Sequence, residues 1–275
     1  MITLNPPLPR EHGSWAMLIV PLLLGLTIAP TWQWRSLLLL VAALGFFLLR
    51  YPLALLVKSR KRPATNRPYL WRWTLIYGLV TMLGGGWLVL VERLWGLAAL
   101  GVLGGGLLFF HLWLVSRRQE MSVIGELAGI FGLALGAPMA YYTATGRLDR
   151  TTAVLWLINA LYFGGTVFYI KLKVRYQPRR PAPDHWSERL LGAKAGLTYH
   201  TIALTVMILL VMLWQAPLLA PLALLPATAK MIYGAYRWQD KKSLSLMRLG
   251  LIEIAHALVF SGLVVLAFSW SSGTV

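Results

Sequence analysis

Eight ionisable residues lie inside, or at the edges of, long apolar stretches of this sequence, where burying a charge is costly. They are His12, Arg50, His111, Glu126, His200, Lys230, Glu253 and His256. Ionisable groups within membrane-embedded helices usually face a bundle interior or a water-filled cavity and mark functional sites. The catalytic candidates are Glu126, Glu253 and His256, because their short side chains cannot easily reach water. We expect the other five to line the same cavity, although the long side chains of Arg50 and Lys230 are equally compatible with snorkelling to the interface.

Glu253 and His256 are three residues apart, so they share one face of a helix. Glu-x-x-His also ligates metal in di-iron bundles, but there the motif occurs twice and with further carboxylates. The single copy here favours a hydrogen-bonded Glu–His pair over a metal site. The chain has no cysteine, which excludes thiolate nucleophiles and cysteine-based zinc or iron–sulfur sites. We therefore expect no metal site and no cofactor.

The elements that must position these residues are membrane helices. The chain is 58% hydrophobic and only 13% charged, with a mean hydropathy of +0.65, which is too apolar for a soluble domain of this size. Spanning a bilayer as a helix takes roughly 20 apolar residues. The sequence predicts an all-α polytopic bundle forming one transmembrane domain over 1–275. Its nine expected helices lie near 13–31, 36–57, 73–91, 95–115, 122–143, 151–170, 193–213, 216–235 and 248–270.

The basic residues predict the orientation of this bundle. With the N-terminus inside, the inner loops and the residues next to them hold 20 of the 26 Lys and Arg residues, a strong positive-inside asymmetry. We expect a multi-pass protein of the cytoplasmic (inner) membrane with an outside C-terminus. Topology also accounts for most of the net charge of +17, so contact with anionic phospholipid head groups is expected and a nucleic-acid partner is not. The sequence indicates no protein partner.

The interior polar groups all fall in the inner half of the predicted bundle, which favours a cavity open to the cytoplasm. Basic side chains from different inner loops could converge there on a phosphate. The candidates are Lys58, Arg60, Arg117, Lys171 and Arg175. On a continuing helix Lys171 and Arg175 share a face, so Lys173 is expected to be solvated. Ser122 is expected to cap the next helix, whose N-terminus also suits an anion.

The segment Arg10 to Met17, reading REHGSWAM, resembles the signature of the YwiC-like family of bacterial membrane proteins. The segment Glu120 to Tyr142, reading EMSVIGELAGIFGLALGAPMAYY, also fits that family.

A more distant resemblance is to the UbiA superfamily of intramembrane prenyltransferases. It is carried by Gly125-Glu126-Leu127 with Gly132 and Gly136, and by Asn66-Arg67-Pro68. The resemblance implies a nine-helix bundle with an inside N-terminus and a cavity open to the cytoplasm and to lipid, with Asn66 and Arg67 near the ligand. UbiA enzymes hold a prenyl diphosphate through magnesium on two Asp-rich motifs. The corresponding loops here are basic, so magnesium is not expected.

These observations lead to one expected function and two alternatives. We expect a cytoplasm-facing cavity that binds an isoprenoid or another lipid with a phosphate or anionic head. The protein would then be either a metal-independent or inactive relative of UbiA-type prenyltransferases or a non-catalytic binding protein. The alternatives are a small-solute transporter and an accessory or assembly subunit of a membrane complex.

Overall fold

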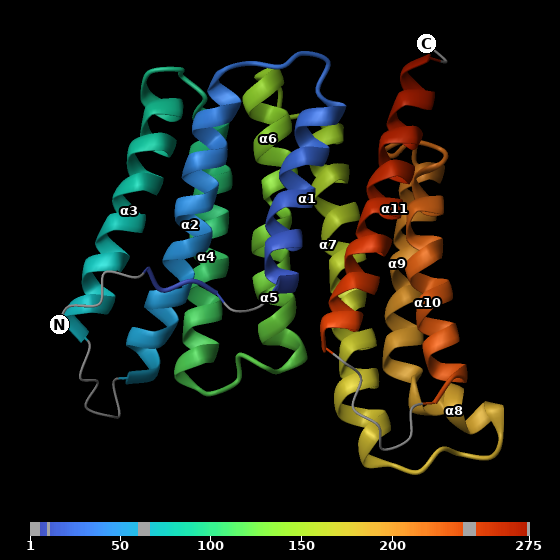
Figure 1. Cartoon of the computed structure of the whole chain (residues 1–275). Coiled ribbons are helices and arrows are strands. Elements are labelled where there is room, and N and C mark those ends of the chain that lie inside the picture. The colour runs from blue at the N-terminus through green and yellow to red at the C-terminus, as the bar shows by residue number, and fades with distance from the viewer. Residues whose placement is uncertain (1–5, 10–11, 60–66, 239–245, 274–275) are drawn as a thin grey trace. The chain divides into compact units, whose positions relative to one another are not determined.

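The computed structural model describes residues 6–9, 12–59, 67–238 and 246–273, and these residues form helices and connecting loops without a β-strand (Figure 1). The helices in chain order are α1 (His12–Ile28), α2 (Arg35–Lys58), α3 (Arg67–Leu90), α4 (Trp95–Ser116), α5 (Val123–Ala134), α6 (Gly136–Thr145), α7 (Arg150–Ile170), α8 (Trp186–Gly192), α9 (Lys194–Met212), α10 (Leu225–Tyr236) and α11 (Leu246–Gly273). A π-helix, Lys171–Tyr176, continues α7, and a short 3-10 helix, Ala220–Leu224, precedes α10.

Seven helical stretches of the described chain are long and apolar enough to cross a membrane, and α5 and α6 together form one of them. These seven agree with seven of the nine expected helices. The other two expected helices correspond to shorter elements. One is α1, with 17 residues, and the other is α10, whose 12 residues follow the 3-10 helix. An all-helical polytopic bundle is therefore confirmed, and the count of nine stays a prediction.

The chain forms two compact units, Met1–Trp156 and Leu157–Val275, which divide within α7. In the first unit, glycines let helix backbones approach closely. Gly84 of α3 faces Ala42 of α2, where a Cβ added to the glycine would lie 3.1 Å from the alanine Cβ. Gly25 of α1 faces Ala137 and Ala140 of α6, and its added Cβ would lie 2.8 Å from the Ala140 Cβ. Small residues at helix contacts are typical of membrane bundles, where close packing replaces the hydrophobic effect.

The membrane segment Val123–Thr145 is broken at Leu135, between α5 and α6. Pro138 follows three residues later and has no backbone N–H to donate to the preceding turn. Around the break, the Leu135 N–H bonds to the Gly132 carbonyl in a 3-10 pattern, and the indole N–H of Trp156 donates to the Phe131 carbonyl at 3.0 Å. The side chain of Trp156 therefore satisfies a backbone group that the break exposes, as a membrane interior requires.

The second unit packs α9, α10, α11 and the later part of α7 around an aromatic core. The ring of Tyr162 on α7 stacks on Phe260 of α11, with centroids 3.9 Å apart. Gly196 of α9 lies against the side chain of Met231 on α10.

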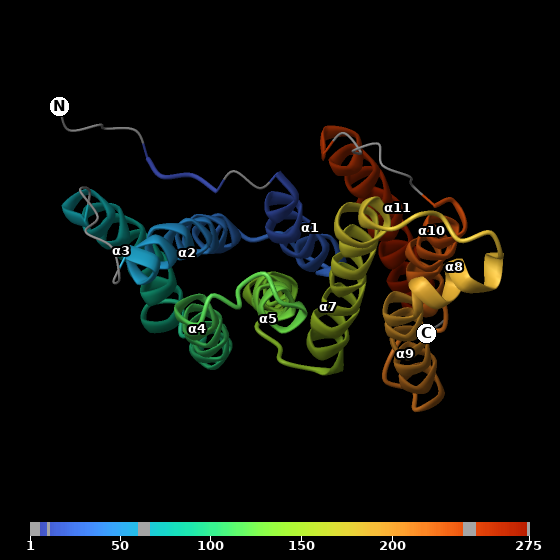
Figure 2. The same ribbon diagram turned by 90° about the horizontal axis from the view of Figure 1, so that it is seen from below.

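One end of each unit carries several basic residues, and the helices that form these ends can be followed in Figure 1 and, seen from below, in Figure 2. In the first unit this end combines the last residues of α2 and α4 with the first residues of α3 and α5, and it carries Lys58, Arg67, Arg117 and Arg118. In the second unit it comprises the π-helix, α8, the start of α9 and the end of α10. The opposite end of the first unit carries Arg35, Arg93, Arg147 and Arg150, so the described basic residues of that unit are divided between its two ends.

Candidate functional site

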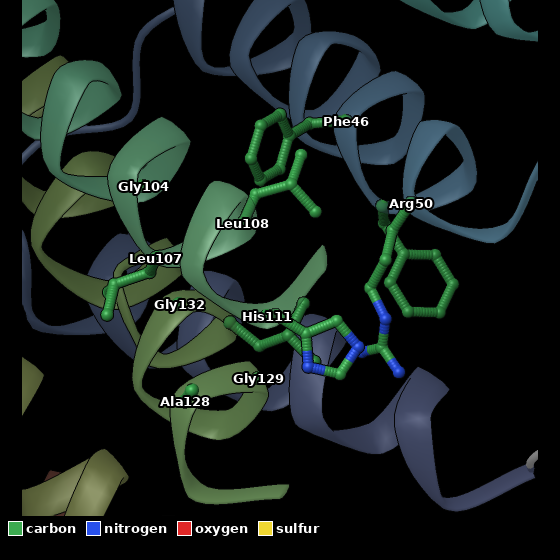
Figure 3. Close-up of a pocket in the computed structure, with 11 residues that line it drawn as sticks. Phe46, Arg50, Gly104, Leu107, Leu108, His111, Ala128, Gly129 and Gly132 are labelled. Atoms are coloured by element: carbon green, nitrogen blue, oxygen red, sulfur yellow. The ribbon is translucent and has the colours of Figure 1, made fainter. Parts of the chain in front are cut away.

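A small cavity in the first unit lies between α2, α4 and α5 (Figure 3). Its volume is about 30 Å³, enough for about one water molecule. Apolar side chains and glycines make up most of its wall, and two cationic or titratable side chains, Arg50 and His111, complete it. The lining residues are Phe46, Phe47, Arg50, Gly104, Leu107, Leu108, His111, Ala128, Gly129, Gly132 and Leu133.

Arg50 and His111 point toward one another across this cavity (Figure 3). Both border Gly129, where an added Cβ would lie 3.6 Å from Arg50 Nη1 and 3.8 Å from His111 Nδ1. His111 is only 6% exposed, and its Nδ1 lies 3.1 Å from the Gly125 carbonyl oxygen. The helices therefore bring two predicted interior residues, from α2 and α4, to one point beside α5.

The backbone of α5 is held tightly where it meets this pair. Ser122 caps the helix by accepting a hydrogen bond from the Gly125 N–H at 3.1 Å, which confirms the cap expected from the sequence. A side chain at Gly125 would collide with the preceding loop, because its Cβ would lie 2.6 Å from the Gln119 carbonyl oxygen and 2.7 Å from that of Glu120. The loop before α5 is thus fixed against the helix that carries Gly129.

An ion pair closes the same end of the first unit. Lys58 Nζ, at the end of α2, lies 2.8 Å from Glu120 Oε1, in the loop between α4 and α5. Partial burial by itself raises the pKa of Glu120. Hydrogen bonds and the positive charges of Lys58 and His111 outweigh this effect, so the pKa lies below its usual value. Arg117, on the same loop, stacks over the ring of Trp113, with its guanidinium carbon 5.5 Å from the ring centroid.

The second unit contains a separate polar cluster that brings three predicted interior residues together. Lys230 Nζ on α10 pairs with Glu253 Oε1 on α11 at 2.7 Å and lies 4.7 Å from the centroid of the Tyr169 ring. His200 is 4% exposed, and its Nδ1 lies 3.3 Å from the hydroxyl oxygen of Thr228, on the same helix as Lys230. Gly165 leaves the room that the His200 ring occupies, since its Cβ would lie 2.7 Å from the imidazole Cε1.

His256 does not take part in the pairing that its spacing suggested. Glu253 binds Lys230 instead, and His256 Nδ1 lies 2.8 Å from the Ile252 carbonyl oxygen of its own helix. The expected Glu253–His256 hydrogen bond is therefore wrong. A cation from a neighbouring helix neutralises a carboxylate in an apolar environment, which a neutral imidazole cannot do.

Lys173 is buried, so the expectation that it is solvated is also wrong. It is 6% exposed, and its Nζ donates to the Arg237 carbonyl at 2.6 Å. Gln177 Nε2 donates to the Gly234 carbonyl at 2.9 Å and Arg189 Nη1 to the Tyr236 carbonyl at 3.0 Å. Three side chains thus satisfy backbone carbonyls at the C-terminal end of α10, which otherwise lack helical partners.

The remaining predicted residues are dispersed. Glu126 is half-buried in the first turn of α5, and Arg67 is exposed at the start of α3. In the second unit Lys171 is half-buried and Arg175 is exposed. The convergence of Lys58 and Arg117 with Lys171 and Arg175 stays a prediction, since the two pairs belong to different units. Three predicted positions are outside the description, namely Arg60, Asn66 and the side chain of His12.

Three residues that make close contacts at these two clusters were not among the site residues predicted from the sequence. Glu120 was visible as an acid within a basic loop, and its isolation among Arg117, Arg118 and the capping Ser122 was the available signal. Gly129 and Gln177 gave no comparable signal, because a single glycine in a glycine-rich helix and a single glutamine in a basic loop are ordinary.

The helices described above define the class of protein, a polytopic helical membrane protein. Residues 8–141 match the model of the family described as YwiC-like protein. The chain is similar to uncharacterized protein YwiC of Bacillus subtilis (strain 168), with 29% identity over 180 residues that cover 66% of this chain and 72% of the relative. It is also similar to an uncharacterized protein of Haemophilus influenzae, with 23% identity over 264 residues covering 94% and 97%. Together these matches support membership of the YwiC-like family. No solved structure matches it.

Proposed function

We propose that the protein binds an amphiphile with a phosphate or other anionic head at the Arg50–His111 cavity, from the cytoplasmic side of the inner membrane. The observation that carries the proposal is the approach of Arg50 and His111 to one another beside Gly129. Arg50 supplies a permanent charge and a planar set of donors suited to a phosphate. Both residues lie within the family match over residues 8–141.

The surroundings of this pair suit an amphiphile better than a free anion. The basic end of the first unit, with Lys58, Arg67, Arg117 and Arg118, would attract an anionic head. Farther from the basic end than Arg50, the wall includes Phe46, Leu107, Leu108 and glycines, which suit an apolar chain. The cavity of about 30 Å³ is too small for a head group as it stands, so binding requires the Arg50 side chain to swing outward with the ligand.

Enzymatic action on such a lipid and simple binding remain the two forms of this proposal. The relationship to UbiA-type prenyltransferases also remains a proposal, and it rests on the short motifs around Glu126 and Arg67. Because Arg50 and the basic loop can neutralise the head group without a bridging cation, we expect binding to be independent of magnesium.

Transport of a small anionic solute is the second candidate, and the break between α5 and α6 favours it. Discontinuous membrane helices often border the substrate sites of transporters. This break lies at Leu135, next to the lining residues Gly132 and Leu133. Flux of labelled phosphate into proteoliposomes would support transport over lipid binding.

The test is a binding measurement on purified protein in nanodiscs, with and without EDTA. The probes are inorganic pyrophosphate, farnesyl diphosphate and dioleoyl phosphatidic acid. The first has only a head group, the second adds an isoprenoid tail and the third has acyl tails, so the contributions of head and tail can be compared. Arg50→Gln should weaken binding roughly ten- to a hundredfold, because a charged hydrogen bond is worth about 1.5–3 kcal/mol. The matched control is Arg72→Gln, an exposed arginine on α3 outside the cavity. Equal losses in both variants would mean a diffuse surface field and would refute the pocket.

A further inference from the structure

The Lys58–Glu120 ion pair joins two of the elements that enclose the candidate cavity. Lys58 ends α2, the helix of Arg50, and Glu120 lies in the loop between α4 and α5, the helices of His111 and Gly129. The two side chains are 49% and 22% exposed. The pair is therefore close enough to solvent for an anion arriving from the basic end to reach it.

Glu120 is placed rigidly relative to His111. Its carbonyl oxygen would lie 2.7 Å from a Cβ at Gly125, so the loop and the start of α5 are in close contact. The carbonyl oxygen of the same Gly125 lies 3.1 Å from His111 Nδ1. One glycine thus separates the backbone of Glu120 from the imidazole of the candidate site.

The carboxylate of Glu120 is only half satisfied. Oε1 binds Lys58 at 2.8 Å, whereas Oε2 is buried and has no hydrogen-bond partner among the described residues. An acceptor that is buried without a partner is destabilising. A carboxylate held in that way is easier to displace than one with both oxygens bonded, and its departure leaves Lys58 free for a new anion.

We propose that Glu120 is an internal competitor for the anionic head, which occupies Lys58 until the ligand arrives. This inference rests on the proposed function and adds a selectivity to it. An incoming head must neutralise Lys58 better than a carboxylate does. Phosphate monoesters, with about two charges, and diphosphates, with more, therefore displace Glu120, and phosphodiesters with one charge do not. Release of Lys58 also frees α2 from the loop before α5, which gives Arg50 room to move.

The first test compares Glu120→Gln with the matched control Glu188→Gln, an exposed glutamate on α8. The probes are inorganic pyrophosphate, farnesyl diphosphate, dioleoyl phosphatidic acid and the phosphodiester dioleoyl phosphatidylglycerol. We expect Glu120→Gln to bind the first three about fivefold more tightly than the parent, which corresponds to about 1 kcal/mol, and to gain binding of phosphatidylglycerol. Glu188→Gln should bind as the parent does.

The outcomes separate this inference from the proposed function. Unchanged or weaker binding by Glu120→Gln, with binding still lost in Arg50→Gln, would leave the proposed function standing and overturn the competitor. Binding by Glu120→Gln where the parent does not bind would support the competitor. Absence of binding in the parent and in Glu120→Gln would overturn both, because removal of the competitor would have exposed no site.

A second measurement covers the case in which Glu120→Gln does not fold. The chain has no cysteine, so spin labels can be attached to Ser59→Cys and Gln119→Cys without further changes. Saturation with pyrophosphate should lengthen the distance between the labels as Glu120 leaves Lys58. A distance that stays the same when pyrophosphate binds would overturn the proposal.

Discussion

Lys230 Nζ on α10 lies 2.7 Å from Glu253 Oε1 on α11, inside the second unit. Their side chains are only 5% and 15% exposed, and the Lys230 ammonium group lies over the face of the Tyr169 ring. Both residues belong to apolar helices, where an unpaired charge is costly to bury. Lys230 and Glu253 neutralise each other's charge and so reduce this cost. Neither residue is available to face lipid alone.

The first prediction follows from this pair. Glu253→Gln should lower the stability of the second unit by about 3–5 kcal/mol, because it leaves Lys230 buried without a counter-charge. The double variant Lys230→Met/Glu253→Leu should recover most of that loss. Thermal unfolding in detergent measures both, and Glu188→Gln is the matched surface control. If Glu253→Gln alone is as stable as the parent, the ion pair does not contribute to the stability of the second unit.

The second prediction concerns Lys173, whose ammonium group donates to the Arg237 carbonyl at the end of α10. Lys173→Met keeps most of the apolar stem and removes the donor, so unfolding should become easier by about 1.5–3 kcal/mol. Lys194→Met, at an exposed position at the start of α9, should be neutral or slightly stabilising, because a cation there opposes the helix dipole. Equal thermal midpoints for the two variants would contradict the capping role.

The third prediction concerns Gly25, which lies against Ala137 and Ala140. Gly25→Ala should cost about 1–3 kcal/mol, because the added methyl group overpacks the contact between α1 and α6. Gly13→Ala, on the same helix with nothing within 4 Å of the added Cβ, should be neutral or gain helix propensity. A thermal midpoint for Gly25→Ala at or above that of Gly13→Ala would refute the close contact.

The fourth prediction tests the orientation of each unit separately, using single cysteines in a chain that has none. Ser59→Cys and Ser187→Cys lie at the basic ends, and Leu148→Cys and Gln215→Cys lie at the opposite ends. An impermeant maleimide applied to intact cells should label the second pair and spare the first. Labelling of Ser59→Cys or Ser187→Cys would reverse the orientation of the unit that carries it.

The fifth prediction concerns pH and the Lys58–Glu120 pair. Since the folded-state pKa of Glu120 is depressed, the stability that the pair contributes is present at neutral pH. It is lost as the pH falls below the usual carboxylate pKa and through the depressed value. The effect should be about 1 kcal/mol or less, because Lys58 is half exposed. Thermal unfolding between pH 6 and pH 3 should therefore show an acid-dependent loss that is smaller in Glu120→Gln.

The sequence was sufficient to predict the parts of the fold that depend on composition along the chain. Apolar run length predicted the long helices. The distribution of Lys and Arg predicted an inside N-terminus, and this orientation stays a prediction. The burial cost of charge also selected Arg50, His111, Lys230 and Glu253 as interior residues, and the structure brings these together as two pairs.

The contacts that the sequence did not predict depend on local departures from the α-helix or on distant partners. Lys171 and Arg175 were placed on one face by assuming 3.6 residues per turn, but residues 171–176 form a π-helix, whose wider turn changes the direction of each side chain. Within this segment Lys173 is buried, Lys171 is half-buried and Arg175 is exposed. Glu253 was paired with His256 because local spacing is visible in a sequence, whereas the approach of Lys230 depends on how α10 packs on α11.

The contact between α1 and α6 also sets an order of events during synthesis. Gly25 is made early, but Ala137, against which it packs, follows more than 100 positions later. At about 5–20 residues per second, α1 is synthesised roughly 5–20 s before its partner α6. The contact between α1 and α6 can therefore form only after most of the first unit has been synthesised.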